Sequence, residues 1–163
     1  MAWSREQLLK HLAELGIEAD TIDHPPVFTV EESQSLRGRI PGAHTKNLFL
    51  KCKKGSIWLV TALEDTQVNL KTLHQKLGSG RLSFGSADLL KELLGITPGS
   101  VSTFGAINDK EQRVSVVLDE ALMLHERINL HPLENTATTG ISREGLMTFL
   151  TACNHPPKIM ALD

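Results

Sequence analysis

The 163-residue chain contains 17 Lys and Arg residues and 19 Asp and Glu residues, which gives a formal net charge of −2. It therefore has no overall basic field of the kind that indicates nucleic-acid binding, and any contact with RNA would depend on a local patch. Hydrophobic residues make up 40% and charged residues 22%, proportions typical of a folded globular protein rather than a disordered chain. We expect one domain over residues 1–163, because no linker, repeat or low-complexity tract interrupts the sequence.

The targeting and cysteine signals favour a cytoplasmic protein without membrane contacts. The first residues alternate charged and apolar side chains and lack the apolar core of a secretory signal. No apolar stretch approaches the length needed to span a membrane. The two cysteines, Cys52 and Cys153, lie far apart and in no metal-binding spacing, which is the usual pattern in a reducing compartment.

The N-terminal part of the chain predicts a helix, a strand and a second helix. Ser4 is a suitable N-cap, leucines follow at helical spacing, and Gly16 is a stop signal. Residues 17–24 resemble a short strand that two prolines end. A capping-box spacing predicts a helix from Thr29 that ends before Gly38.

The stretch Gly42–Leu50, with the sequence Gly-Ala-His-Thr-Lys-Asn-Leu-Phe-Leu, is predicted to open as a polar loop and to become a buried strand. Lys46 and Asn47 lie where the two meet. A lysine beside apolar walls can neutralise an oxyanion or a phosphate. A lone lysine at a strand end more often keeps its ammonium in water.

The remaining elements follow from apolar runs, caps and turn residues. Residues 48–51 and 57–62 predict a hairpin with a four-residue turn at 53–56. Further helices are predicted at residues 69–77, at 86–94, from Asp119, and from Ser142 onward. Further strands are predicted at residues 81–84, 101–107, 113–118, 127–131 and 136–141.

Most successive strands are joined by turns too short for a parallel crossover. The sequence therefore predicts an α+β fold, with a mixed, largely antiparallel sheet and helices packed around it.

Several kinds of catalytic site are excluded. The seven histidines include no pair with the close helical spacing of a zinc enzyme, so we expect no metal. No Gly-x-Ser-x-Gly motif is present, and neither cysteine lies in a catalytic signature. We expect no cofactor.

The loop Gly95–Val101, with the sequence Gly-Ile-Thr-Pro-Gly-Ser-Val, is more informative. Gly99 and Ser100 leave room for backbone N–H groups to approach an anion or a carbonyl oxygen. The loop is not a Walker motif, since no Gly-Lys-Ser/Thr follows it. Considered alone, it is more simply a connection between a helix and a strand.

Two further features have an ordinary and a functional interpretation. His131 precedes a proline that ends a strand, and strand ends often carry binding sites, although a lone histidine there is more often structural. Lys51, Lys53 and Lys54 form a basic hairpin tip. Such a tip is usually a solvated turn, but it can also hold phosphates.

Five segments together resemble a known family. They are His24-Pro-Pro-Val-Phe-Thr-Val-Glu-Glu32, Gly42–Leu50, Gly95–Val101, Phe104-Gly-Ala-Ile-Asn-Asp109 and Ile128-Asn-Leu-His-Pro-Leu-Glu-Asn-Thr-Ala-Thr138. Their order and spacing over nearly the whole chain resemble the YbaK-type aminoacyl-tRNA editing domains. Within that superfamily, the sequence is most similar to the free-standing alanyl-tRNA(Pro) deacylases.

The resemblance implies hydrolysis of the ester of mischarged Ala-tRNA(Pro), made when a synthetase pocket sized for proline accepts a smaller side chain. It implies that Lys46 pairs with a phosphate or an oxyanion, with Asn47 beside it. Phe28, Val30 and His131 would line the pocket. Gly99, Ser100 and Val101 would supply backbone donors for the oxyanion, and Lys51, Lys53 and Lys54 would contact tRNA. No general base is evident, so the neighbouring ribose hydroxyl would help to activate water.

Mischarged tRNA(Pro), and with it prolyl-tRNA synthetase, are the expected partners. Two alternatives remain open at this point. The first keeps the chemistry but changes the substrate to Cys-tRNA(Pro) or Ser-tRNA. The second is a non-catalytic module that binds tRNA or a synthetase through the basic tip, with salt-sensitive binding and no turnover.

Overall fold

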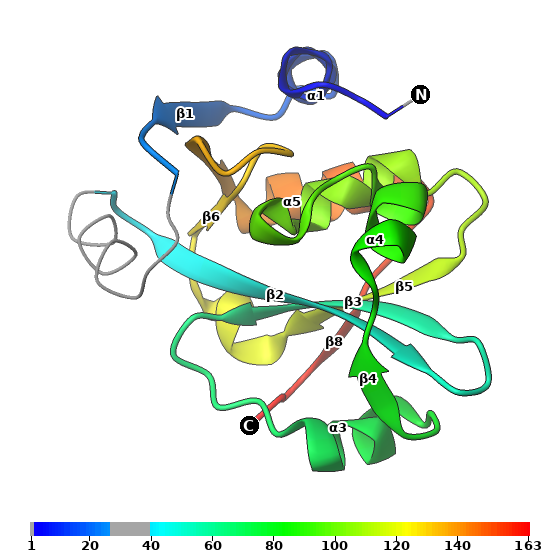
Figure 1. The fold of residues 1–163 in the computed structure, drawn as a ribbon. Coiled ribbons are helices and arrows are strands. Elements are labelled where there is room, and N and C mark those ends of the chain that lie inside the picture. The colour runs from blue at the N-terminus through cyan, green and yellow to red at the C-terminus, as the bar shows by residue number, and fades with distance from the viewer. Residues whose placement is uncertain (1, 27–39) are drawn as a thin grey trace.

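The computed structural model describes residues 2–26 and 40–163. Within these residues, eight strands form one mixed sheet in the order β1-β7-β6-β2-β3-β5-β8, and β4 pairs separately with β2. Helices pack on this sheet (Figure 1). The predicted α+β class with a mixed sheet is confirmed.

The strands and helices have the following bounds. The strands are β1 Ala19–Asp23, β2 Ala43–Cys52, β3 Ile57–Leu63, β4 Leu82–Phe84, β5 Val114–Asp119, β6 Arg127–Leu130, β7 Ala137–Ser142 and β8 Lys158–Met160. The α-helices are α1 Arg5–Glu14, α3 Leu70–Leu77, α4 Ala87–Leu94 and α5 Arg143–Ala152. The 3-10 helices are η1 Pro98–Ser100, η2 Thr103–Asn108 and η3 Glu120–Leu124.

Local sequence signals explain several of these boundaries. The side chain of Ser4 caps α1 in a capping box with Gln7. Ser86 and Ser142 cap α4 and α5 by accepting hydrogen bonds from backbone N–H groups. Each such cap contributes about 1 kcal/mol. The four-residue turn between β2 and β3 is also confirmed.

The hairpin of β2 and β3 separates two layers of the core (Figure 1). Successive strand residues point to opposite faces of a sheet. Phe49 and Leu59 therefore pack with α4 on one face, whereas Leu50 and Val60 pack with α3 on the other. A third cluster packs α1, α5 and η2 against β5, β6 and β7.

One edge of β2 is open along part of its length. β3 covers the other edge, from Thr45 to Lys51. On the open side, β6 pairs only with Ala43 and His44, and β4 pairs only with residues 50–52. Between these contacts, no other strand of the described residues runs along β2. The backbone N–H of Gly85 also donates to the carbonyl oxygen of Phe49 at 2.9 Å. We therefore call residues 45–48 the open edge of β2.

Two predicted elements are wrong. Residues 101–107 contain no strand, because residues 103–108 form η2, whose residues 103–107 are all buried. An apolar run enclosed on every side fits a buried helical turn as well as a strand. The polar start of Gly42–Leu50 is also not a loop. β2 begins at Ala43, where pairing with β6 extends the strand. The short β8 was not predicted, and the helix predicted from Thr29 lies outside the described residues.

A buried polar pair ties the end of α5 to the turn before β5. His155 and Asp109 have side chains that are each 2% exposed, and His155 Nε2 lies 2.9 Å from Asp109 Oδ2. His155 Nδ1 lies 2.8 Å from the carbonyl oxygen of Cys153. Asp109 also accepts hydrogen bonds from the backbone N–H groups of Arg113 and Val114. Every polar atom of the pair is thus satisfied, as burial requires.

Replacement of His155 by alanine is expected to lower the free energy of unfolding by about 3 kcal/mol, because it leaves a buried carboxylate without its ring partner. Urea denaturation followed by circular dichroism measures the loss. His125 is exposed, so His125→Ala serves as the control and should change stability by no more than about 0.5 kcal/mol. Equal losses in the two variants would contradict the role of the pair.

Candidate functional site

Lys46 lies in the middle of β2, with its ammonium held by the backbone. It faces Ala62 across the β2–β3 pairing. Its Nζ donates a hydrogen bond to the carbonyl oxygen of Thr66, in the loop after β3. The side chain is half-buried. An ammonium group has three donors, so this contact orients Lys46, and the described residues leave further N–H groups available to an anion.

Asn47 belongs to a cluster of hydroxyl groups. Its Oδ1 accepts a hydrogen bond from Thr61 Oγ1 at 2.6 Å and a longer one from Thr103 Oγ1 at 3.4 Å. The two threonine hydroxyls lie 2.5 Å apart, and both threonines are fully buried. Because the amide oxygen is the acceptor in this cluster, the Nδ2 group of Asn47 is the part left to donate elsewhere.

Lys46 and Asn47 therefore point to opposite faces of the strand, although they are adjacent in sequence. Asn47 shares its face with Phe49 and α4, and Lys46 shares its face with Leu48 and α3. A ligand that contacts both side chains has to reach them from the open edge of β2, where no neighbouring strand intervenes within residues 2–26 and 40–163.

The loop Gly95–Val101 contains η1 and lies against the loop that follows β6. A Cβ atom on Gly99 would lie 3.4 Å from Asn135 Nδ2, so these two loops are in contact. Val101 packs against the cluster that contains Phe49. The backbone N–H of Ser100 donates to the carbonyl oxygen of Thr97 at 2.9 Å and is therefore already used. Among the described residues, no backbone hydrogen bond outside the helices and strands comes from the N–H groups of Gly99 or Val101.

His131 follows β6, and its tautomer is fixed by the backbone. Its Nδ1 lies 3.1 Å from the carbonyl oxygen of Ala137. A carbonyl oxygen only accepts, so Nδ1 carries the proton and Nε2 of the neutral ring is a hydrogen-bond acceptor. Burial lowers the pKa of His131, and the neighbouring His24 lowers it further. The two ring centroids lie 6.5 Å apart, and His24 Nε2 lies 2.8 Å from Thr138 Oγ1.

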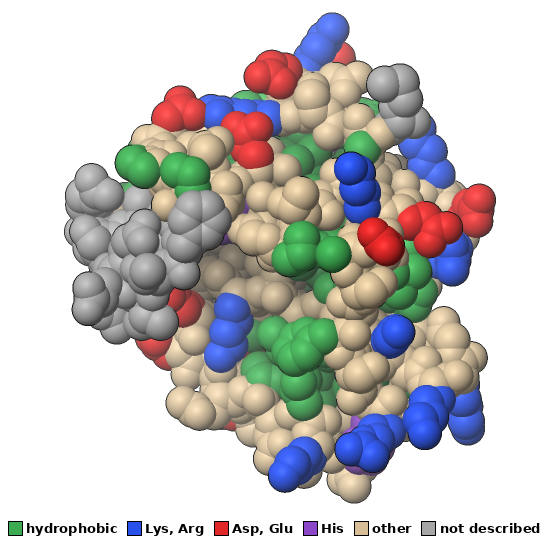
Figure 2. Space-filling view, in the orientation of Figure 1, with side chains coloured by type: hydrophobic (Ala, Val, Ile, Leu, Met, Phe, Trp, Pro, Cys, Tyr) green, Lys and Arg blue, Asp and Glu red, His purple; other side chains and the backbone are tan. Residues whose placement is uncertain are grey.

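The basic tip lies away from these groups, at the far end of β2. Lys51, Lys53 and Lys54 are exposed. Arg81 directly precedes β4, and β4 pairs with the end of β2, so the fold adds a fourth exposed cation beside the tip. Figure 2 shows lysine and arginine side chains gathered over this end of the molecule, where α3, β4 and the hairpin lie. The local basic patch thus exists despite the negative net charge.

The structure brings together only part of the predicted site. Asn47 and Val101 lie on the face of β2 that carries Phe49. Gly99 and His131 belong to the two loops that meet at Asn135. No hydrogen bond joins Lys46 to the loop Gly95–Val101 or to His131 within the described part of the chain. Phe28 and Val30 lie outside the described residues.

Sequence reasoning assigned no role to Thr61, Thr103 or Thr66. A threonine in a strand or an apolar run has the same pattern as a valine, so only its hydroxyl hints at a polar contact. His24 stood in the first segment that resembles the family, but its contact with Thr138 depends on strand pairing.

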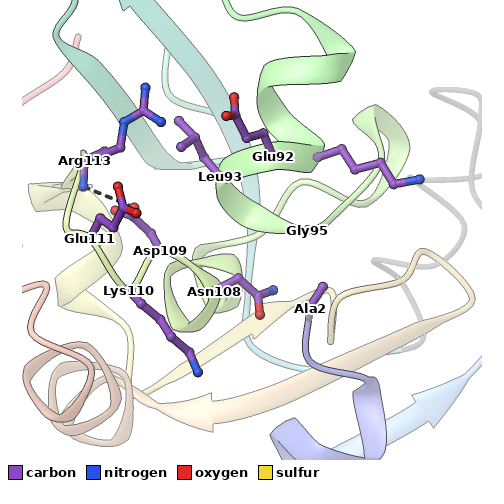
Figure 3. Close-up of a pocket in the computed structure, with 10 residues that line it drawn as sticks. Ala2, Glu92, Leu93, Gly95, Asn108, Asp109, Lys110, Glu111 and Arg113 are labelled. Carbon is purple, nitrogen blue, oxygen red and sulfur yellow. Dashed lines mark hydrogen bonds between the residues drawn. The ribbon is translucent and has the colours of Figure 1, made fainter.

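A cavity of about 380 Å³ lies between the end of α4 and the turn before β5. Figure 3 shows Asp109 turned toward the backbone of Arg113, and Glu92 and Lys110 at separate sides of the cavity. Of the predicted site, only Gly95, at the start of the loop Gly95–Val101, lines this cavity. Across residues 2–26 and 40–163, no group of three or more His, Cys, Asp or Glu side chains is placed to hold a metal ion. No helix in that same part of the chain is long and apolar enough to cross a membrane.

The chain resembles proteins whose names refer to prolyl-tRNA. It is 39% identical over 164 residues to prolyl-tRNA synthetase associated domain-containing protein 1 of Mus musculus, with 98% of this chain and 96% of the relative covered. It is 38% identical over 160 residues to the prolyl-tRNA editing protein ProX of Acetoanaerobium sticklandii, with 98% of each protein covered.

The fold is shared with a crystal structure named as a candidate trans-editing enzyme for prolyl tRNA synthetase. The TM-score is 0.73 at 16% sequence identity, with 100% of this chain and 99% of that chain covered. A family model described as the aminoacyl-tRNA editing domain matches residues 24–149. The resemblance predicted from the sequence is thereby confirmed, and the chain belongs to the aminoacyl-tRNA editing domain family.

Proposed function

We propose that this protein is a trans-editing deacylase that hydrolyses the ester of mischarged Ala-tRNA(Pro). The observation that carries the proposal is the open edge of β2. Lys46 and Asn47 flank this edge on opposite faces, and Asn47 shares its face with Val101 of the loop Gly95–Val101. The names of relatives that refer to prolyl-tRNA editing support the same substrate class.

Ester hydrolysis needs a positioned water, stabilisation of the tetrahedral oxyanion and an anchored terminal adenosine. Lys46 supplies positive charge for the oxyanion or for the terminal phosphate, since only one of its three donors has a partner among the described residues. Backbone donors for the oxyanion come from Gly99 and Val101. Ser100 acts through the shape of η1, because its own N–H is engaged with Thr97.

His131 is assigned to the aminoacyl group rather than to the oxyanion. Its neutral Nε2 accepts a hydrogen bond from the amino group of the substrate, while the Nδ1 contact with Ala137 fixes the ring. Phe28 and Val30 complete the proposed pocket as apolar walls. Among the described residues of the proposed pocket, no carboxylate stands as a general base, so the neighbouring ribose hydroxyl of the substrate helps to activate the water.

Asn47 is proposed to bind substrate through Nδ2, because its Oδ1 is occupied by Thr61 and Thr103. The basic tip of Lys51, Lys53 and Lys54, together with Arg81, is proposed to hold tRNA phosphates.

We also infer that residues 1–163 form one editing domain, which is supported by strands from both ends of the chain in a single sheet. Prolyl-tRNA synthetase, as the source of mischarged tRNA(Pro), is the proposed protein partner.

Mutation of Lys46 tests the catalytic assignment. Lys46→Ala is expected to lower kcat/KM for release of alanine from Ala-tRNA(Pro) by about 100-fold or more, because loss of a charge that stabilises an oxyanion typically costs about 2.7 kcal/mol or more. The exposed Lys10 provides the control, and Lys10→Ala should retain full activity. Full activity in Lys46→Ala would refute the role.

Parallel assays with Cys-tRNA(Pro) and Ser-tRNA identify the preferred substrate.

The protonation of His131 is a second test. The pKa of His131 should lie below its ordinary value of 6.5, as measured from the pH dependence of its ring resonances in NMR spectra. His24→Ala should raise this pKa, because it removes a like charge and part of the burial. Since the folded protein disfavours the proton, the associated stability is present above pH 6.5 and is lost as the pH falls through the lowered pKa. The rate of deacylation should also fall as the pH falls through this lowered pKa.

His131→Gln identifies the resonance of His131, since that signal disappears in the variant. A pKa at or above 6.5 in the unmodified protein would contradict the proposed environment.

The basic tip gives a third test. Each of Lys51→Ala, Lys53→Ala and Lys54→Ala is expected to weaken tRNA binding and to reduce the slope of log K against log salt by about 1. Fluorescence anisotropy at several salt concentrations measures both quantities. An unchanged salt dependence in all three variants would remove the tip from the tRNA interface.

A further inference from the structure

A buried carboxylate organises the loop that holds Lys46. Asp119 is the last residue of β5. It is buried, with 1% of its surface exposed. Its Oδ2 accepts hydrogen bonds from the backbone N–H of Leu63 at 3.0 Å and from Thr66 Oγ1 at 2.5 Å. Its Oδ1 accepts from the backbone N–H of Ala121 at 3.1 Å. The first and last residues of the turn Leu63–Thr66 are therefore attached to one carboxylate oxygen.

Thr66 connects this carboxylate to the ammonium of Lys46. The hydroxyl of Thr66 donates to Asp119, while the carbonyl oxygen of the same residue accepts from Lys46 Nζ. The backbone N–H of Thr66 donates to the carbonyl oxygen of Leu63 at 3.0 Å, which closes the loop. Asp119 therefore fixes the position of the oxygen that Lys46 binds.

Asp119 and Lys46 have side chains of opposite charge type on the two sides of Thr66. The three hydrogen-bond donors to Asp119 that are known from the described residues are neutral groups, and a buried carboxylate is stabilised by a nearby cation. The ammonium of Lys46 is hydrogen-bonded to Thr66, the residue whose hydroxyl donates to Asp119. The loop also carries Glu64 and Asp65, which have contacts of their own.

We propose that Asp119 and Thr66 are positioning residues for Lys46, which set where its ammonium lies beside the open edge of β2. The inference rests on the proposed deacylase function. Neither residue touches the substrate. Asp119 acts on Thr66, and Thr66 acts on Lys46. A carboxylate this deeply buried does more than cap η3, because two of its three donors belong to the loop that carries the acceptor of Lys46.

Asp109 offers a matched control for a purely structural role. It is also a buried aspartate, 3% exposed, and it also accepts hydrogen bonds from two backbone N–H groups. Its third partner is His155, and no contact links it to Lys46 among the described residues. Asp119→Asn and Asp109→Asn therefore both remove a buried charge, but only the first removes a charge next to Thr66.

The experiment compares five single variants of the whole chain: Asp119→Asn, Thr66→Val, Thr66→Ser, Asp109→Asn and Lys46→Ala. Deacylation of Ala-tRNA(Pro) gives kcat and KM separately. A ¹H–¹⁵N correlation spectrum of the lysine ammonium groups reports the environment of Lys46, whose signal is identified by its loss in Lys46→Ala. Thermal unfolding shows that each variant is folded at the assay temperature.

We expect Asp119→Asn and Thr66→Val to lower kcat about tenfold, with KM changed less than about twofold, because a displaced catalytic group affects the transition state more than substrate binding. Both variants should shift the ammonium signal of Lys46. Thr66→Ser keeps the hydroxyl and should match the unmodified protein in both readouts. Asp109→Asn should lose stability but keep kcat and the Lys46 signal.

Two results would overturn the inference. If Asp119→Asn and Asp109→Asn lower kcat equally and neither shifts the Lys46 signal, Asp119 is only structural. If Thr66→Ser behaves as Thr66→Val does, the hydroxyl contact is not responsible. If the unmodified protein releases no amino acid from any of the three mischarged tRNAs, the proposed function fails instead. The ammonium spectra then still decide whether Asp119 and Thr66 position Lys46.

Discussion

The antiparallel pairing of β2 with β3 is the constraint on which the candidate site depends. The register runs from Thr45 opposite Leu63 to Lys51 opposite Ile57. A slip by one residue would exchange the faces of every side chain on β2. It would move Lys46 into the space beside Thr61 and Thr103, and Asn47 away from them. The hydrophobic clusters on the two faces oppose such a slip, since each would have to accept a polar residue.

The β2 strand can serve both as a core element and as one wall of a site because its other edge is covered unevenly. β6 covers its beginning and β4 covers its end. A fully paired strand buried on both faces would leave its side chains no route to a ligand. An edge open along the whole strand would expose backbone groups to pairing with other chains. The short open edge avoids both outcomes.

Much of the fold could be predicted because its signals are local. Serine caps, the glycines after α3 and α4, and the hairpin turn each depend on a few adjacent residues. The errors arose where distant partners decide the conformation. Residues 103–107 form a helical turn where Phe104, Ala106 and Ile107 are enclosed between helices and sheet. The polar residues after Gly42 are extended because β6 and β3 pair with them. Neither partner is visible in a local window.

The candidate site shows the same division. Lys46, Asn47 and the loop Gly95–Val101 were found through their resemblance to a family, whereas periodicity alone favoured a solvated lysine. The partners that fix these groups were not predicted. Thr66 and Asp119 are separated by 53 residues, and a single aspartate at a strand end is ordinarily a cap. Their contact with each other follows only from the positions of β3 and β5 in the sheet.

The position of β1 at the edge of the sheet has a consequence for the histidine pair. β7 is the only strand that β1 contacts in the described residues, and Arg5 of α1 holds its end through Asp23 and Glu134, at 2.6 and 2.9 Å. His24 directly follows β1. Edge strands open by local unfolding at lower free energy than the core. Each opening of β1 carries His24 away from His131 while the rest of the sheet stays folded, so the docking equilibrium of the N-terminal strand sets how long the two rings remain together.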